Sequence, residues 1–91
     1  MAPEKITENM VNGLFELLAS IENAKDMELL FADLCTKNEI EQMTQRLMAA
    51  KLLLQGKTYN QVIEATDISS ATLSRVSNAV KYGNGYKQFI K

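Results

Sequence analysis

The chain has 91 residues, of which 46% are hydrophobic and 23% charged, which suits one small folded domain and is too short for two cores. It contains no His, no Trp and a single Cys, so the sequence excludes imidazole catalysis, His metal ligation and an internal disulfide. The lone thiol, together with the lack of a long apolar run or a signal sequence, predicts a cytoplasmic protein with no membrane partner.

The charged residues are unevenly distributed along the chain. Residues 1–45 carry three Lys and nine acids, a formal charge of −6, whereas residues 46–91 carry seven Lys or Arg and two acids, a charge of +5. Charges in salt solution act over about 8–10 Å. The basic half can therefore meet a polyanion although the net charge is −1.

Apolar residues recur at intervals of three and four in the first half of the chain, which predicts amphipathic helices. A first helix is predicted over residues 5–22 and a second around residues 27–34. A third is predicted over residues 37–55, between a capping box at Thr36 and Glu39 and a left-handed stop at Gly56. We expect these helices to face the core through Ile6, Met10, Leu14, Leu17, Leu18, Ile21, Met27, Leu30, Phe31, Leu34, Ile40, Met43, Leu47, Ala49, Ala50 and Leu54.

The second half of the chain predicts two shorter helices joined by a tight turn. Thr58 and Gln61 form a second capping box, and that helix ends near residue 66. The next helix begins at Ser69 or Ser70 and ends at Gly83, and a helical turn follows in residues 84–90. The spacing is typical of a helix-turn-helix, although Asp67 stands where such turns usually have Gly.

The outer face of the second of these helices is small, polar or basic, so its side chains can approach base edges without steric cost. The helix N-termini can bind phosphate oxygens. The sequence therefore predicts double-stranded DNA as partner, contacted by Lys57, Thr58, Asn60, Gln61, Ser69, Ser70, Ala71, Thr72, Ser74, Arg75, Asn78 and Lys81.

A second interpretation is a protein–protein interaction module in which the same helical hairpin docks a partner without DNA. Under it, binding depends on apolar groups such as Tyr82 and Phe89 more than on salt. An enzyme is disfavoured, because Glu39 and Glu41 are two residues apart on a helix and face different sides. We expect no catalytic residues and no metal, and we expect Cys35 to be a small buried residue.

Several segments of the chain resemble the Trp repressor superfamily. Within that superfamily they are most similar to the small Trp-repressor-related proteins of the YerC/YecD type. Gly56–Ile63 and Ala71–Asn78 are similar to the family's helix-turn-helix, and Asp33–Ile40 with Gln45–Leu47 is similar to the preceding loop and helix. The resemblance covers about residues 10–85. It implies an all-α fold of about six helices and an intertwined homodimer whose two recognition helices, about 34 Å apart, read a palindromic operator.

The resemblance also implies that residues 1–91 form a single domain whose two parts have different functions. Residues 1–55 are expected to form the dimerisation scaffold and residues 58–82 the helix-turn-helix of a transcriptional regulator, expected to be a repressor. The base-reading positions of the family fall on Ser70, Ala71, Thr72 and Ser74.

The family's tryptophan corepressor site is only partly matched. Its contacts fall on Thr36, Arg46 and Arg75, but the position that bonds the ligand's amino group is Ala79, which has no hydroxyl. No cofactor is therefore certain, and a tryptophan-like corepressor is the candidate small molecule.

Overall fold

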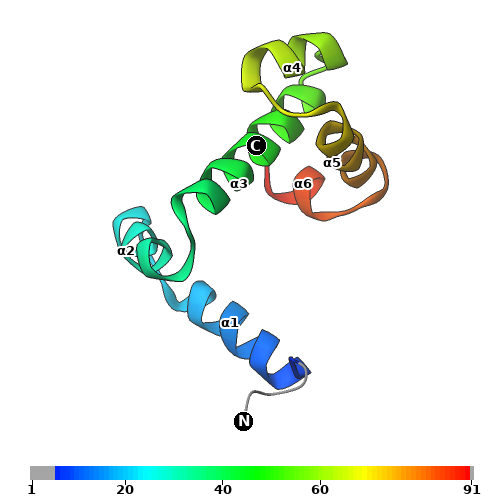
Figure 1. The fold of residues 1–91 in the computed structure, drawn as a ribbon. Coiled ribbons are helices and arrows are strands. Elements are labelled where there is room, and N and C mark those ends of the chain that lie inside the picture. The colour runs from blue at the N-terminus through cyan, green and yellow to red at the C-terminus, as the bar shows by residue number, and fades with distance from the viewer. Residues whose placement is uncertain (1–5, 91) are drawn as a thin grey trace. The chain divides into compact units, whose positions relative to one another are not determined.

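The computed structural model describes residues 6–90, which form six helices and no strand. Figure 1 shows them in chain order. They are α1 (Glu8–Ser20), α2 (Ala24–Leu34), α3 (Lys37–Leu54), α4 (Tyr59–Thr66), α5 (Ser70–Tyr82) and α6 (Gly85–Phe89). The predicted all-α class is confirmed. None of these helices has the length and hydropathy of a membrane-spanning segment. The chain divides into two compact units, residues 1–36 and residues 37–91.

The first unit contains α1 and α2, each started by a side-chain cap. The Thr7 hydroxyl accepts the Met10 N–H at 3.3 Å, and the Asn23 side chain accepts the Asp26 N–H at 2.8 Å. The expected burial of the apolar stripes is wrong within this chain, because no described residue of either helix is buried. Met10, for example, is 50% exposed. Two short helices offer each other too little surface to cover two apolar faces.

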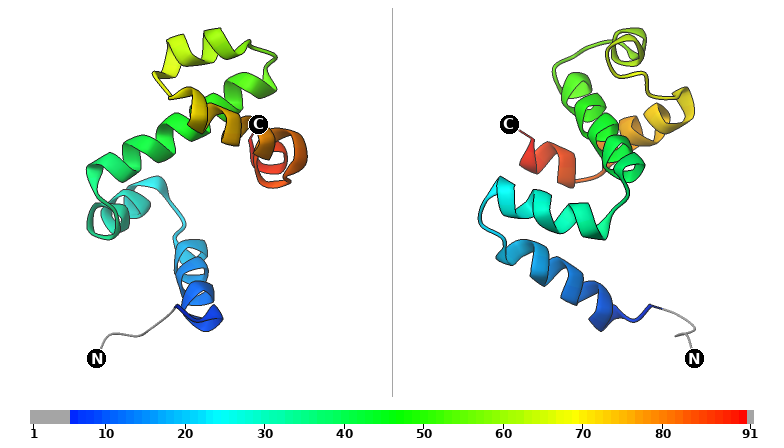
Figure 2. Two further views of the ribbon diagram at one scale, coloured as in Figure 1. Left: turned by 45° about the vertical axis from the view of Figure 1, so that its right-hand side comes forward. Right: turned by 60° about the vertical axis from the view of Figure 1, so that its left-hand side comes forward.

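The second unit is built around α3, which packs against α4, α5 and α6, as Figures 1 and 2 show. Its core consists of Ala49, Ala50, Val62, Ile68, Leu73 and Val76. Ala49 and Ala50 are fully buried, and their small side chains let neighbouring helices approach α3 closely. The rest of the expected α3 stripe is not buried; Leu47 is 52% exposed. Because α3 packs with the helices that follow it, the boundary between the two compact units falls after Thr36.

The prediction that Cys35 is buried is also wrong, since its side chain is half-buried. It lies at the C-cap of α2, where its N–H donates to the Phe31 carbonyl at 2.9 Å. The thiol is only half-buried because Cys35 lies at the end of a helix, and the two helices of this unit do not cover it on all sides.

The end of α3 has the glycine stop that the sequence predicts. The Lys57 N–H donates to the Leu52 carbonyl at 3.1 Å and the Gly56 N–H to the Leu53 carbonyl at 3.0 Å. These two bonds form a Schellman motif, in which the residue directly after the helix C-cap takes the left-handed conformation. Gly56 supplies it with φ +86°. The motif turns the chain directly into the cap of α4.

Replacing Gly56 by Ala is expected to lower the free energy of unfolding by about 1 kcal/mol, since an L-residue is strained at positive φ. Gly85→Ala is the matched control. A Cβ meets nothing within 4 Å at either position, but only Gly56 has positive φ. Urea denaturation of both variants measures the difference. Equal stability of the two variants would contradict the assigned turn.

Candidate nucleic-acid interface

The N-terminus of α4 is closed by the capping box that the sequence predicts. The Thr58 N–H donates to Gln61 Oε1 at 2.9 Å, and the Gln61 N–H donates to Thr58 Oγ1 at 3.2 Å. Both side chains are exposed, as are Lys57 and Asn60 beside them. Four predicted DNA contacts therefore lie together at the start of α4, where the helix dipole is positive.

The N-terminus of α5 is capped by Ser69. Its Oγ accepts the Thr72 N–H at 3.2 Å, and its hydroxyl donates to Thr72 Oγ1 at 2.9 Å. The start of α5 thus matches the first of the two predicted caps, Ser69 rather than Ser70. The second bond also engages the Thr72 oxygen, which leaves Thr72 fewer ways to bind a base.

The turn between α4 and α5 contains a left-handed residue that is not glycine. Asp67 takes the left-handed conformation, φ 60° and ψ 23°, which Asp tolerates better than most residues. The Thr66 hydroxyl donates to the Val62 carbonyl at 2.8 Å and accepts the Ile68 N–H at 3.3 Å. From α3, Gln45 Nε2 donates to the Thr66 carbonyl at 3.2 Å. Sequence reasoning missed Gln45 and Thr66, because no local pattern shows that Gln45 reaches a carbonyl on another helix.

Opposite faces of α5 have opposite roles. Leu73, Val76 and Ser77 are buried against the rest of the second unit. The predicted DNA contacts on the other side are exposed, namely Ser70, Ala71, Ser74, Arg75, Asn78 and Lys81, while Thr72 is half-buried. Lys81 is in the last turn of α5, and a helix rises about 1.5 Å per residue. It therefore lies well away from the N-terminal end that carries Ser70 and Ala71.

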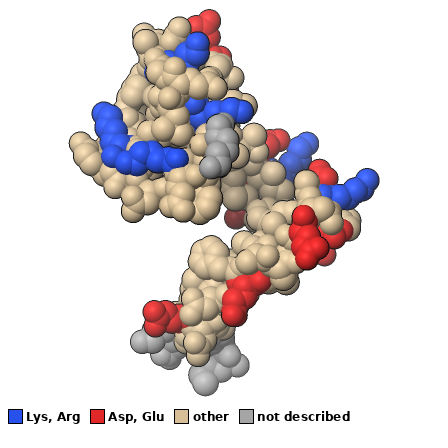
Figure 3. Space-filling model, turned by 180° about the vertical axis from the view of Figure 1, so that it is seen from behind, with Lys and Arg blue, Asp and Glu red and all other residues tan. Residues whose placement is uncertain are grey.

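Charge separates between the two units. Residues 37–91 carry eight Lys or Arg and four acids, whereas residues 1–36 carry two Lys and seven acids. On the face that Figure 3 displays, most of the acidic side chains lie along the first unit, and several basic ones lie over the second. The helix-turn-helix is thus part of the positively charged unit, as contact with a polyanion requires.

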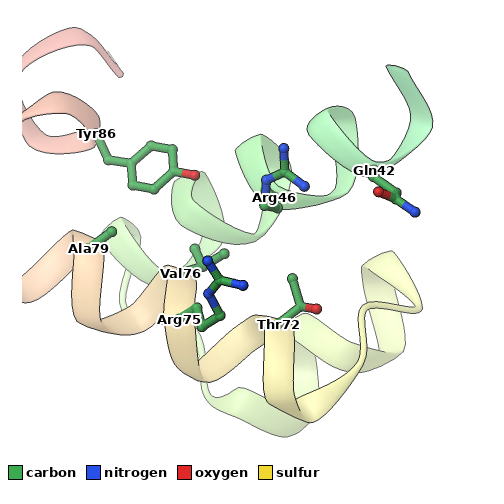
Figure 4. Close-up of a pocket in the computed structure, with 7 residues that line it drawn as sticks. All are labelled: Gln42, Arg46, Thr72, Arg75, Val76, Ala79 and Tyr86. Atoms are coloured by element: carbon green, nitrogen blue, oxygen red, sulfur yellow. The ribbon is translucent and has the colours of Figure 1, made fainter. Parts of the chain in front are cut away.

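A pocket of about 390 Å³ opens where α3, α5 and α6 meet. It is lined by Gln42, Arg46, Thr72, Arg75, Val76, Ala79 and Tyr86. Figure 4 shows Arg46 extending from α3, Arg75 extending from α5, and the Tyr86 ring approaching from α6. The structure thus brings together two of the predicted effector residues, Arg46 and Arg75, whereas Thr36 belongs to the first unit.

The sequence did not indicate Gln42 or Tyr86 as pocket residues. Tyr86 follows a glycine stop and is remote in sequence from α3, so only the packing of α6 brings it to the pocket. Among residues 6–90, no group of three or more His, Cys, Asp or Glu side chains could hold a metal ion.

Comparisons with known proteins agree on one family. The model of the Trp repressor protein family matches residues 9–91. The chain is 37% identical over 84 residues to YerC of Bacillus subtilis, described as an uncharacterized protein, covering 92% of this chain and 81% of that protein.

Two solved structures are similar over most of the chain. A candidate Trp repressor from Staphylococcus aureus is 36% identical with a TM-score of 0.88, over 99% of this chain and 91% of that one. A TrpR-like protein from Eubacterium eligens is 37% identical with a TM-score of 0.83, over 90% of this chain and 84% of that one. At these identities the resemblance concerns sequence as well as fold.

Ser69→Ala is expected to lower the free energy of unfolding by about 1 kcal/mol, because the first turn of α5 loses its cap. Ser70→Ala is the control, since Ser70 is also exposed and lies one residue beyond the cap. Thermal or urea denaturation compares the two. A loss of stability in Ser70→Ala alone would show that the cap is misassigned.

Proposed function

The chain belongs to the Trp repressor family, a family of DNA-binding regulators and not of enzymes, and on that premise we propose that it is a sequence-specific transcriptional repressor in the cytoplasm. It acts as a homodimer on a palindromic operator. The observation that carries the proposal is the pair of capped helices, α4 and α5, whose exposed faces are small, polar and basic.

The side chains of this interface favour modest direct readout. Ser70, Ala71 and Ser74 are exposed, and hydroxyl and methyl groups are permissive partners for base edges. Specificity then depends in part on bridging water and on DNA shape. Lys57 and the N-termini of α4 and α5 supply phosphate contacts, which set the salt dependence of binding.

Dimerisation is supported by the uncovered apolar faces of the first unit. Phe15 is 61% exposed and Leu29 is 68% exposed, and no described residue of α1 or α2 is buried. A soluble monomer rarely leaves so much apolar surface open. Two copies that cover these faces would carry two recognition helices, as a palindrome requires.

The pocket beside α5 is the proposed effector site of this regulator. Arg46 and Arg75 line it, and the resemblance adds Thr36. Tryptophan is the reference ligand for testing it.

One observation favours a second candidate function, a protein–protein interaction module. Tyr82 is 83% exposed and Phe89 is 73% exposed, so each offers an aromatic contact to a protein partner. Binding of that kind would respond to Tyr82→Ser or Phe89→Ser and little to ionic strength.

Selection of duplexes from a random pool at two salt concentrations, with and without tryptophan, is expected to enrich a palindrome. Lys57→Gln should then weaken binding to all duplexes alike and reduce the slope of log K against log salt by about one unit. Lys25→Gln is the matched control, because Lys25 is an exposed lysine of the first unit. Failure to retain any duplex at low salt would refute the proposed function.

Phe15→Asp is expected to convert the dimer to monomer, because a carboxylate would be buried without a partner in the interface. Asn12→Asp, also exposed on α1, should leave the dimer intact. Analytical ultracentrifugation measures the mass of each variant. A dimer that survives Phe15→Asp would place the dimer interface elsewhere.

A further inference from the structure

We propose that Asn84 is a site of spontaneous deamidation, at which the backbone nitrogen of Gly85 attacks the Asn84 side chain and a carboxylate replaces the neutral amide. Both residues lie where the chain passes from α5 to α6, as Figure 1 shows. The modification site rests on the local structure alone. Its consequence, a weaker hold on DNA, rests on the proposed function.

The sequence contains two Asn-Gly pairs, Asn12-Gly13 and Asn84-Gly85. Glycine hinders attack on the preceding side chain least, because it has no Cβ beside the attacking nitrogen. The two pairs therefore have the same intrinsic chemistry. Their surroundings in the structure differ, and that difference favours reaction at Asn84.

The reacting groups of Asn84 and Gly85 are both free. The Asn84 side chain is exposed and makes no capping hydrogen bond. Gly85 is the first residue of α6, where an N–H has no acceptor within its own helix, and no other group among residues 6–90 accepts from it. A Cβ at Gly85 would meet nothing within 4 Å. One hydrogen bond, from the Gln88 N–H to the Asn84 carbonyl at 3.1 Å, restrains the peptide group that must rotate.

The backbone of Asn12-Gly13 is held much more firmly. The pair lies inside α1 (Glu8–Ser20), where each N–H donates to the carbonyl four residues earlier. The Gly13 nitrogen is thus engaged with Asn9, and the Asn12 carbonyl with Glu16. Ring closure there requires the helix to open on both sides of the pair. Asn12 is as solvent-facing as Asn84, so the backbone and not exposure separates the two sites.

The reaction consumes only water. The Gly85 nitrogen forms a bond to Asn84 Cγ and gives up its proton, the Cγ–Nδ2 bond breaks, and ammonia leaves, so that a cyclic imide remains. Water then opens the imide either at Cγ, which yields aspartate, or at the Asn84 main-chain carbonyl carbon, which yields isoaspartate. No atom is oxidised or reduced. Either product carries a negative charge where the chain had a neutral amide.

The new charge arises between two lysines. Asn84 is three residues from Lys81 and three from Lys87, and Lys87 Nζ donates to the Lys81 carbonyl across this turn at 3.3 Å. Charges in salt solution act over about 8–10 Å. The carboxylate therefore lowers the positive potential around Lys81, a predicted DNA contact, and phosphate is attracted less strongly.

Peptide mapping by tandem mass spectrometry tests the site on the full-length protein. After incubation in mildly alkaline buffer, we expect Asn84 to convert roughly tenfold or more faster than Asn12, because only Asn12 must wait for a helix to open. In guanidinium chloride the two sites should convert at similar rates. Equal rates in the folded protein, or no conversion of Asn84, would overturn the proposal. A preference that persists in guanidinium chloride would overturn it too, because the structure would not be its cause.

Two glycine variants test the attacking nitrogen. Gly85→Ala should slow conversion of Asn84 about tenfold or more, since a methyl group then hinders the approach. Gly13→Ala is the matched control and should leave the rate at Asn84 unchanged. An added Cβ meets nothing within 4 Å at either glycine, so both variants are expected to fold. Equal rates at Asn84 in Gly85→Ala and the wild type would contradict the mechanism.

Fluorescence anisotropy with a selected duplex tests the consequence. Asn84→Asp, which is one of the two products, is expected to weaken binding about two- to fivefold at low salt and less at high salt. Asn12→Asp adds the same charge to the first unit and should change the affinity little. Equal affinity of Asn84→Asp and the wild type would overturn the consequence. If no duplex binds at all, the proposed function and the consequence both fall, while the mass spectra still decide the modification site.

Discussion

The close approach of α4 and α5 to α3 is the constraint on which the second unit depends. Ala49 and Ala50 lie fully buried in its core, together with Val62 of α4 and Leu73 of α5. A larger side chain at either alanine would have to displace a helix, because protein interiors are close-packed. The position of α5 is thus set by the volume of two methyl groups on a different helix.

The same packing explains why the proposed DNA-binding face and the pocket adjoin. Burial of Leu73 and Val76 orients α5, and the helical period then places Ser74 and Arg75 on the exposed side. Arg75 lies at the edge, where α5 also borders the pocket.

The two units divide apolar surface and charge between them. The second unit has a core of its own and most of the basic residues, whereas α1 and α2 have no buried residue and lie in an acidic segment. The uncovered apolar helices and most of the basic residues therefore belong to different units. The acidic residues of the first unit repel a phosphate backbone, whereas the basic residues of the second unit attract one.

The sequence by itself determined the helices and their ends, because caps and stops are local. The Thr58 and Gln61 box, the Ser69 cap and the left-handed Gly56 each depend on groups within a few residues. Its resemblance to the Trp repressor superfamily was confirmed as well. Only the tertiary structure decided what the helices bury and what they bring together. It left Met10 and Leu47 uncovered, joined Gln45 to the Thr66 carbonyl and brought Tyr86 beside Arg46. Amphipathic spacing shows that a face is apolar, but what covers that face depends on helices distant in the sequence.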